Sequence, residues 1–226
     1  MGVEIHPYTT VEQVLTDAGK VQGVVSSRGQ TSAPIVVNAA GAFSREVAAL
    51  AGVELPLERY RIEALVTESL RPFMRPAISL ISLHGYAHQT SRGEFVGGTE
   101  FAIPDRSDSL QVTRAMLIDM AQKFVRVIPQ LAGARVARHW AGLVSQAADL
   151  ASVLGPVPEL EGFYLSCGWL YGFMGAPASG DLLAESIVTG RVHEWVEPFG
   201  IERLRTGRLI VDETLIQKPE DVKASA

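Results

Sequence analysis

Two stretches of the sequence each place an apolar run, a turn of small residues and a helix-forming segment in succession, and they constrain the fold most. The first, residues 35–50, runs from IVV through NAAGA to a predicted helix over residues 44–50. The second, residues 162–188, runs from GFYLSC through a glycine-rich turn to a predicted helix over residues 177–188. A short apolar run before a helix is typical of a strand in a parallel sheet that is buried on both faces. The sequence therefore predicts an α/β crossover at each stretch.

The small residues in these two turns are compatible with a ligand that approaches the backbone closely. A helix that begins after such a turn offers unpaired N–H groups and a partial positive charge at its N-terminus. This end suits a phosphate or any ligand atom that becomes negative. A tight turn is also needed in any α/β crossover, so each turn taken singly fits a purely structural role as well.

The remaining sequence divides the chain into three predicted parts. Residues 1–55 read as a β-rich unit with a hairpin turn at Asp17-Ala18-Gly19-Lys20, followed by the first crossover. Residues 56–138 contain strand-like runs of antiparallel type and a long amphipathic helix over residues 110–128. Residues 139–226 return to strand, turn and helix and end in a polar tail.

Composition and charge exclude several functional classes among the 226 residues. Lys and Arg total 20 against 25 Asp and Glu, a formal charge of −5 without a basic block, so nucleic-acid binding is not expected. The single Cys167 excludes an internal disulfide or a cysteine-based metal site, and no metal is expected. No apolar run of about 18 residues predicts a membrane span. The first ten residues lack the layout of a signal peptide, which favours a cytoplasmic location.

A series of motifs in fixed order adds a family resemblance. The series comprises residues 37–44 (VNAAGAFS), Trp140-Ala141-Gly142, Asp149, Gly155-Pro156 and residues 172–177 (GFMGAP). It resembles the C-terminal portion of the FAD-dependent amine oxidases and dehydrogenases of the D-amino-acid oxidase superfamily. Within that superfamily the sequence is most similar to the sarcosine oxidase β-subunit, glycine oxidase, opine oxidase and D-hydroxyproline or proline dehydrogenase group.

The resemblance implies a fold of α/β (α+β) class. It implies a partial FAD/NAD(P)-binding Rossmann-like domain, formed by residues 1–55 and 139–226, and an antiparallel-sheet substrate domain over residues 56–138. The family's first βαβ unit carries a G-x-G-x-x-G turn that holds the pyrophosphate. No such motif occurs in these 226 residues, so the sequence resembles a portion that lacks this unit.

The resemblance also implies a bound FAD. A helix that starts near Gly175 would direct its N-terminus at the flavin N1–C2=O edge, where reduced flavin is negative. The family's flavin-linking cysteine would fall near residues 145–147, where no cysteine occurs, so FAD would be non-covalent. The candidate cofactor-binding residues are Val11, Ala39, Ala40, Gly41, Gly172, Phe173, Met174 and Gly175.

The reaction implied by the resemblance is oxidation of a C–N bond in a small amine or amino acid, such as sarcosine, glycine, a D-amino acid, proline or an opine. A hydride passes from the substrate carbon to the flavin, and the imine that remains hydrolyses without a protein nucleophile. The candidate catalytic residues are Met174, Tyr171 and His139. Met174 stands where sarcosine oxidase-like members often carry lysine, so the partner of the substrate carboxylate is left open.

Two further interpretations stay open from the sequence. The chain could be a catalytically silent fragment or subunit with a structural or partner-interface role, which predicts an exposed apolar surface where the absent βαβ unit would dock. It could also be a generic α/β ligand-binding module. Besides the substrate, the expected partners are other subunits or the absent N-terminal half.

Overall fold

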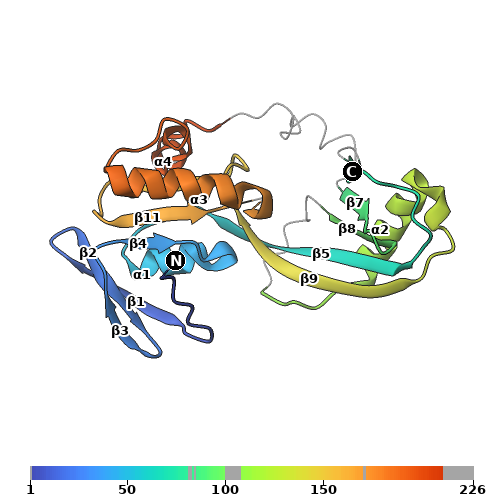
Figure 1. Cartoon of the computed structure of the whole chain (residues 1–226), viewed down its shortest axis with the longest axis horizontal. Coiled ribbons are helices and arrows are strands. Elements are labelled where there is room, and N and C mark those ends of the chain that lie inside the picture. Colours follow the sequence, from blue (N-terminus) through green and yellow to red (C-terminus); the bar gives the residue numbers. More distant parts are fainter. Residues whose placement is uncertain (1, 81–82, 84, 100–107, 170–171, 211–226) are drawn as a thin grey trace. The chain divides into compact units, whose positions relative to one another are not determined.

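The computed structural model describes residues 2–80, 83, 85–99, 108–169 and 172–210 (Figure 1). The chain divides into two compact units. The first comprises Met1–Arg59 and Ser145–Ala226, and the second comprises Tyr60–Val144. Strands β5 (Glu58–Ser69) and β9 (Val136–Gln146) carry the chain between them.

The first unit opens with a three-stranded antiparallel meander. Its strands are β1 (Val11–Asp17), β2 (Lys20–Ser26) and β3 (Gly29–Ser32), in that order. Ala18 and Gly19 between β1 and β2 both have positive φ, 47° and 76°. Positive φ at both central residues is the requirement of a two-residue hairpin turn whose twist matches the strands. The predicted hairpin is thereby confirmed.

The second sheet of this unit contains both predicted crossovers. Its order is β10 (Val153–Pro156), β11 (Phe163–Cys167) and β4 (Val36–Asn38). Strand β11 pairs with β10 antiparallel and with β4 parallel. A 3-10 turn and helix α1 (Ser44–Leu50) follow β4, and helix α3 (Gly172–Thr189) follows β11. The predicted parallel pairing is confirmed.

Alternation along β11 separates the core of the first unit from its outer layer. Phe163, Leu165 and Cys167 are fully buried, whereas Tyr164 and Ser166 between them are partly exposed. The buried side chains join apolar residues from β1, β2, α1 and β10 in one cluster. Burying a large apolar side chain stabilises a fold by about 1.5–3 kcal/mol, so this unit has a core of its own.

The C-terminal segment of the first unit is fixed by a buried ion pair. Arg203 lies in the short helix α4 (Glu202–Thr206), and its Nε and one terminal nitrogen donate to the Asp149 carboxylate at 2.7 and 3.1 Å. The guanidinium also donates to the carbonyls of Ala151 and Phe199 at 2.9 and 2.6 Å. Both side chains are almost fully buried, and the geometry is bidentate, as the strongest such pairs are.

Burial alone would raise the pKa of Asp149, but its hydrogen bonds outweigh this effect. Donors from Arg203 and from the backbone of Ile210 and Ala151, together with the Arg203 charge, hold the Asp149 pKa below its usual range. The stabilisation from this lowered pKa is therefore present at neutral pH. It is lost as the pH falls below the ordinary aspartate pKa of about 3.9 and through the lower folded value.

We expect Arg203→Met to destabilise the first unit by about 3–5 kcal/mol at neutral pH, because it leaves a buried carboxylate without its counter-charge. The difference from the parent chain should shrink in acid, where Asp149 is protonated in both proteins. Urea unfolding at a series of pH values measures this. Arg205→Met is the matched control, because Arg205 of the same helix pairs with the partly exposed Glu159 and Glu202 and should cost less than about 1 kcal/mol. Equal losses of unfolding free energy in the two variants would contradict a stabilising role of the buried Asp149–Arg203 pair.

The second unit is built on a five-stranded sheet. Its order is β6 (Ile78–Leu80), β7 (Gly85–Gln89), β8 (Glu94–Thr99), β5 and β9. The pairs β6–β7, β7–β8 and β5–β8 are antiparallel, as the sequence predicts for the middle of the chain.

Helix α2 (Arg114–Val127) covers one face of this sheet through Met120 and Phe124, and a side chain at Gly97 would overlap the Phe124 ring. The helix begins four residues later than the predicted residue 110. The reason is Thr113, whose side chain caps the helix by accepting the Met116 N–H at 3.2 Å.

Candidate functional site

The parallel register of β4 and β11 brings the two crossover turns to the same edge of the sheet. Phe163 lies opposite Val36 and Leu165 opposite Asn38, so the strands end side by side. In open α/β sheets, ligands bind outside the carboxyl ends of the strands. This edge therefore gathers Ala39, Ala40 and Gly41 with the start of α3, and it is the candidate site of the first unit.

Buried polar side chains shape the first turn. Asn38 is buried, and its Oδ1 accepts the Ala40 N–H at 3.2 Å while its Nδ2 donates to the Ser44 carbonyl at 2.8 Å. Gly41 has a φ of 57°, which glycine adopts at little cost. The Ser145 hydroxyl donates to the Gly41 carbonyl at 2.8 Å and so ties the end of β9 to this turn.

Arg59 completes the support of the first turn. Its guanidinium lies 2.8 Å from the Glu46 carboxylate and 4.9 Å from the centre of the Phe43 ring. Ala39 and Gly41 remain exposed, so the turn presents backbone rather than side chains outward. Asn38 belongs to the motif of residues 37–44, but the sequence indicated no separate role for its side chain. The hydrogen bond from Ala40 to Asn38 could have been predicted, because asparagine in a turn commonly hydrogen-bonds the backbone two residues onward.

The second turn is built on the indole of Trp169. A methyl group at Gly175 would overlap the six-membered ring of Trp169, and one at Gly172 would lie 3.1 Å from the Trp169 Cβ. The two glycines therefore let the first turn of α3 rest on the indole. Phe173 and Met174 between them point outward, 97% and 72% exposed. The candidate Tyr171 lies outside the described residues.

The N-terminus of α3 has the electrostatic character that the sequence analysis expected. Among the described residues α3 begins at Gly172, three residues before the predicted Gly175, and its first turn contains no acidic side chain that would neutralise the positive end of the helix. Small residues and the positive end of a helix at one sheet edge fit a cofactor whose reactive ring becomes anionic. Cys167 contributes no nucleophile there, because burial raises the pKa of its thiol to about 12.

Two of the predicted site residues, Val11 and His139, lie in other sheets. Val11 lies at the start of β1, in the meander sheet, and is partly buried. His139 lies in the second unit, where its Nε2 is 2.7 Å from Oε2 of the buried Glu63 without hydrogen-bond alignment. Glu63 also accepts the Thr113 N–H at 3.1 Å and the Thr113 hydroxyl at 3.2 Å. His139 thus contacts Glu63 near the start of α2, and it also lines a shallow pocket of about 490 Å³ together with residues 110–112 and 138–141.

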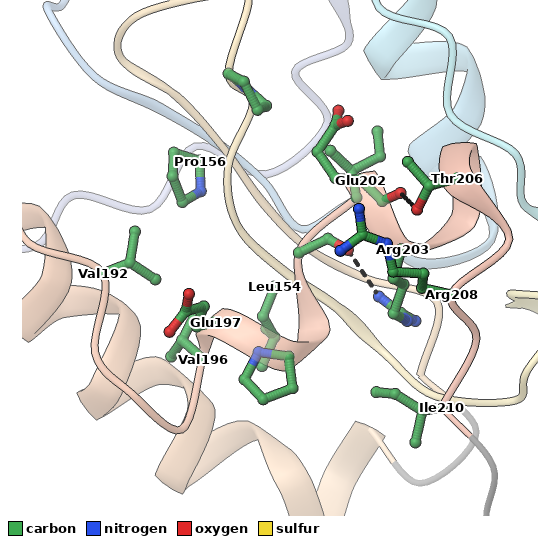
Figure 2. A pocket seen from close by; sticks show the side chains of 14 residues that line it. Leu154, Pro156, Val192, Val196, Glu197, Glu202, Arg203, Thr206, Arg208 and Ile210 are labelled. Carbon is green, nitrogen blue, oxygen red and sulfur yellow. Dashed lines mark hydrogen bonds between the residues drawn. The ribbon is translucent and has the colours of Figure 1, made fainter.

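A separate groove of about 850 Å³ lies on the first unit (Figure 2). It is formed by β10 and residues 192–210, with Leu154, Val196 and Arg203 among its lining side chains. Neither crossover turn contributes to it, so it is distinct from the candidate cofactor edge. Among the described residues, no group of three His, Cys, Asp or Glu side chains could hold a metal ion. No described helix is long and apolar enough to cross a bilayer.

The first unit, with a parallel strand pair whose two turns share one edge, has the arrangement of an α/β domain that binds a ligand at the carboxyl ends of its strands. Comparison with known families makes this specific. The chain belongs to the DAO family of FAD-dependent oxidoreductases, which matches residues 1–186.

Individual relatives agree with the family match. The chain is 33% identical to the sarcosine oxidase subunit beta of Arthrobacter sp. over 211 residues, which cover 93% of this chain and 52% of the relative. It is 30% identical to glycine oxidase of Pseudomonas putida over 83% of this chain and 50% of the relative. The structure of L-proline dehydrogenase from P. horikoshii has a TM-score of 0.84 at 31% identity, covering 90% of this chain and 55% of that one. The chain spans about half the length of the curated relatives it matches.

We expect Gly175→Ala to destabilise the chain, because its methyl group overlaps Trp169. Gly180→Ala is the matched control, since a methyl group at Gly180 in the same helix meets no atom within 4 Å. The control should stabilise the chain by about 0.5–1 kcal/mol, the usual gain of alanine over glycine in a helix. Thermal unfolding of both variants measures the contrast, and adding Trp169→Leu to Gly175→Ala should restore part of the loss. Equal stability of the two single variants would contradict the packing role of Trp169.

Proposed function

We propose that this chain forms the C-terminal portion of an FAD-dependent oxidoreductase that oxidises the C–N bond of a small amine or amino acid. The observation that carries the proposal is that both crossover turns meet at one sheet edge, where the first turn of α3 contains no acidic side chain. Membership of the DAO family supports the cofactor. We propose that the first unit binds FAD and that the second unit binds the substrate.

The proposed roles follow the chemistry of each residue. The backbones of Ala39, Ala40 and Gly41 and the first turn of α3 at Gly172 and Gly175 would lie along the cofactor. The α3 N–H groups would stabilise negative charge on the ring, and FAD when bound supplies the acceptor for a hydride from the substrate carbon.

The side chains proposed near the flavin and substrate are Phe173, Met174 and Tyr171. We assign Val11 a backbone contact with the adenine end. We assign His139 a positioning role, because its contact with Glu63 would hold β5 and β9 in register at the start of α2. FAD would be bound non-covalently.

The proposed substrates are small amines that carry a carboxylate. The chain matches about half the length of three relatives, whose names refer to sarcosine, glycine and L-proline. Met174 offers no charge for the carboxylate, so an arginine or lysine elsewhere in the complete enzyme would bind it. Sarcosine oxidase subunit beta is by its name part of an assembly, and we propose that this chain also works with further subunits.

The test is anaerobic reduction of the flavin in the enzyme purified with its partner polypeptides. Sarcosine, glycine and L-proline are each mixed with the holoenzyme, and glycolate serves as the control that lacks the amine. We expect loss of oxidised-flavin absorbance with at least one amine and none with glycolate. An assembly that contains FAD but is reduced by none of these amines would favour the alternative of a catalytically silent subunit.

A further inference from the structure

A buried carboxylate connects β5 with the start of helix α2 in the second unit. Glu63 of β5 is buried, and its carboxylate accepts the N–H and the hydroxyl of Thr113 at 3.1 and 3.2 Å. The Thr113 hydroxyl in turn accepts the Met116 N–H, so Glu63 orients the residue that caps α2. The positive N-terminal end of a helix favours a negative charge at this place. An ionised Glu63 therefore holds the start of α2 on β5.

Two basic side chains lie beside the Glu63 carboxylate. The Nε2 atom of His139, on β9, is 2.7 Å from Oε2 of Glu63, and the His139 side chain is 9% exposed. One terminal nitrogen of Arg61 is 3.6 Å from Oε1 of Glu63, and the other donates to the Gln111 carbonyl at 2.8 Å. A buried carboxylate is costly unless positive charge and hydrogen bonds compensate it. A proton on His139 supplies part of this compensation, and loss of the proton removes that part.

A shallow pocket gives solvent access to the contact between Glu63 and His139. Its volume is about 490 Å³, and its walls are residues 110–112, which lead into α2, and residues 138–141 of β9. His139 is part of this wall, while its Nε2 atom lies next to Glu63. Protons from solvent therefore reach a histidine whose side chain is otherwise buried.

The other charged residues on the elements that pack here keep their charge near neutral pH. They are Arg61 on β5, Arg138 on β9, Arg114 on α2 and Asp108 on the segment before α2. Arginine side chains stay protonated in proteins, and Asp108 is exposed to solvent. Histidine is the residue type whose charge changes between about pH 5 and about pH 8. A change of charge in this pH range therefore points to His139.

We propose that the contact between Glu63 and His139 is a pH-sensitive latch for residues 111–113, the segment that leads into α2. With a proton on His139, the contact is an ion pair that keeps Glu63 ionised and bonded to Thr113. As the pH rises and His139 loses this proton, the buried carboxylate loses compensating charge, and the bonds to Thr113 open more often. The latch is thus tighter in mild acid and looser in mild alkali. Because residues 111 and 112 line the pocket, the same step widens access to it.

The test measures hydrogen exchange of the Thr113 amide in the full chain from about pH 5.5 to about pH 8. Each rate is divided by the intrinsic exchange rate at that pH, so that only the protection is compared. We expect the protection of Thr113 to fall by about threefold or more as the pH rises. The Phe95 amide of the same sheet is the internal control, because it donates to the Thr67 hydroxyl, which does not titrate. Constant protection of Thr113, or protection that increases with pH, would overturn the proposal.

Three variants identify the group that binds the proton. His139→Gln and Glu63→Gln each remove one charge of the latch, and in both the protection of Thr113 should depend on pH no more than that of Phe95. His88→Gln is the matched control, because His88 lies on β7, two strands from β5 in the same sheet, and this variant should keep the pH dependence. A pH dependence that persists in His139→Gln, or that disappears in His88→Gln, would contradict the latch.

Nuclear magnetic resonance of the parent chain gives a result even where a variant fails to fold. The ring signals of His139 should titrate with the same midpoint as the protection of Thr113, and different midpoints would overturn the proposal. Neither flavin nor amine enters these measurements. The latch therefore stands or falls independently of the proposed function.

Discussion

The parallel pairing of β4 with β11 is the constraint on which the candidate site depends. It fixes two strands with the same direction, and therefore two turns at one edge, although the turns are about 130 residues apart in the sequence. An antiparallel pairing would place the same turns at opposite edges. The direction of one strand pair thus decides whether small residues at two distant positions form one site.

Around β4 and β11, several side chains fix the backbone conformation of the two turns. Asn38 and Ser145 hold the first turn through its carbonyl and amide groups, and Trp169 supports the second through two glycines. The edge presents the exposed residues Ala39 and Gly41 together with the outward side chains of Phe173 and Met174 and the N-terminus of α3. Small residues in the first turn and the positive end of α3 fit the cofactor of the DAO family.

The buried Asp149–Arg203 pair stabilises the C-terminal part of the first unit. Arg203 lies beyond the 186 residues that match the family, whereas Asp149 lies within them. The pair therefore fastens a segment outside the family match onto the core of the first unit, and the groove beside β10 follows from that attachment. Because a buried pair is costly to break on one side only, this attachment is a condition of the unit's stability.

Sequence alone determined the local elements, because strands, turns and helix caps depend on residues close in the chain. The hairpin at Ala18 and Gly19, both crossovers and the DAO resemblance were predicted from such patterns. Only the tertiary structure decided the support of Gly175 by Trp169 and the contact of His139 with Glu63. These depend on contacts between residues far apart in the sequence, whose register no local periodicity specifies. A histidine on an alternating strand is equally compatible with either face, and the pairing of β9 with β5 in the sheet brings His139 to Glu63.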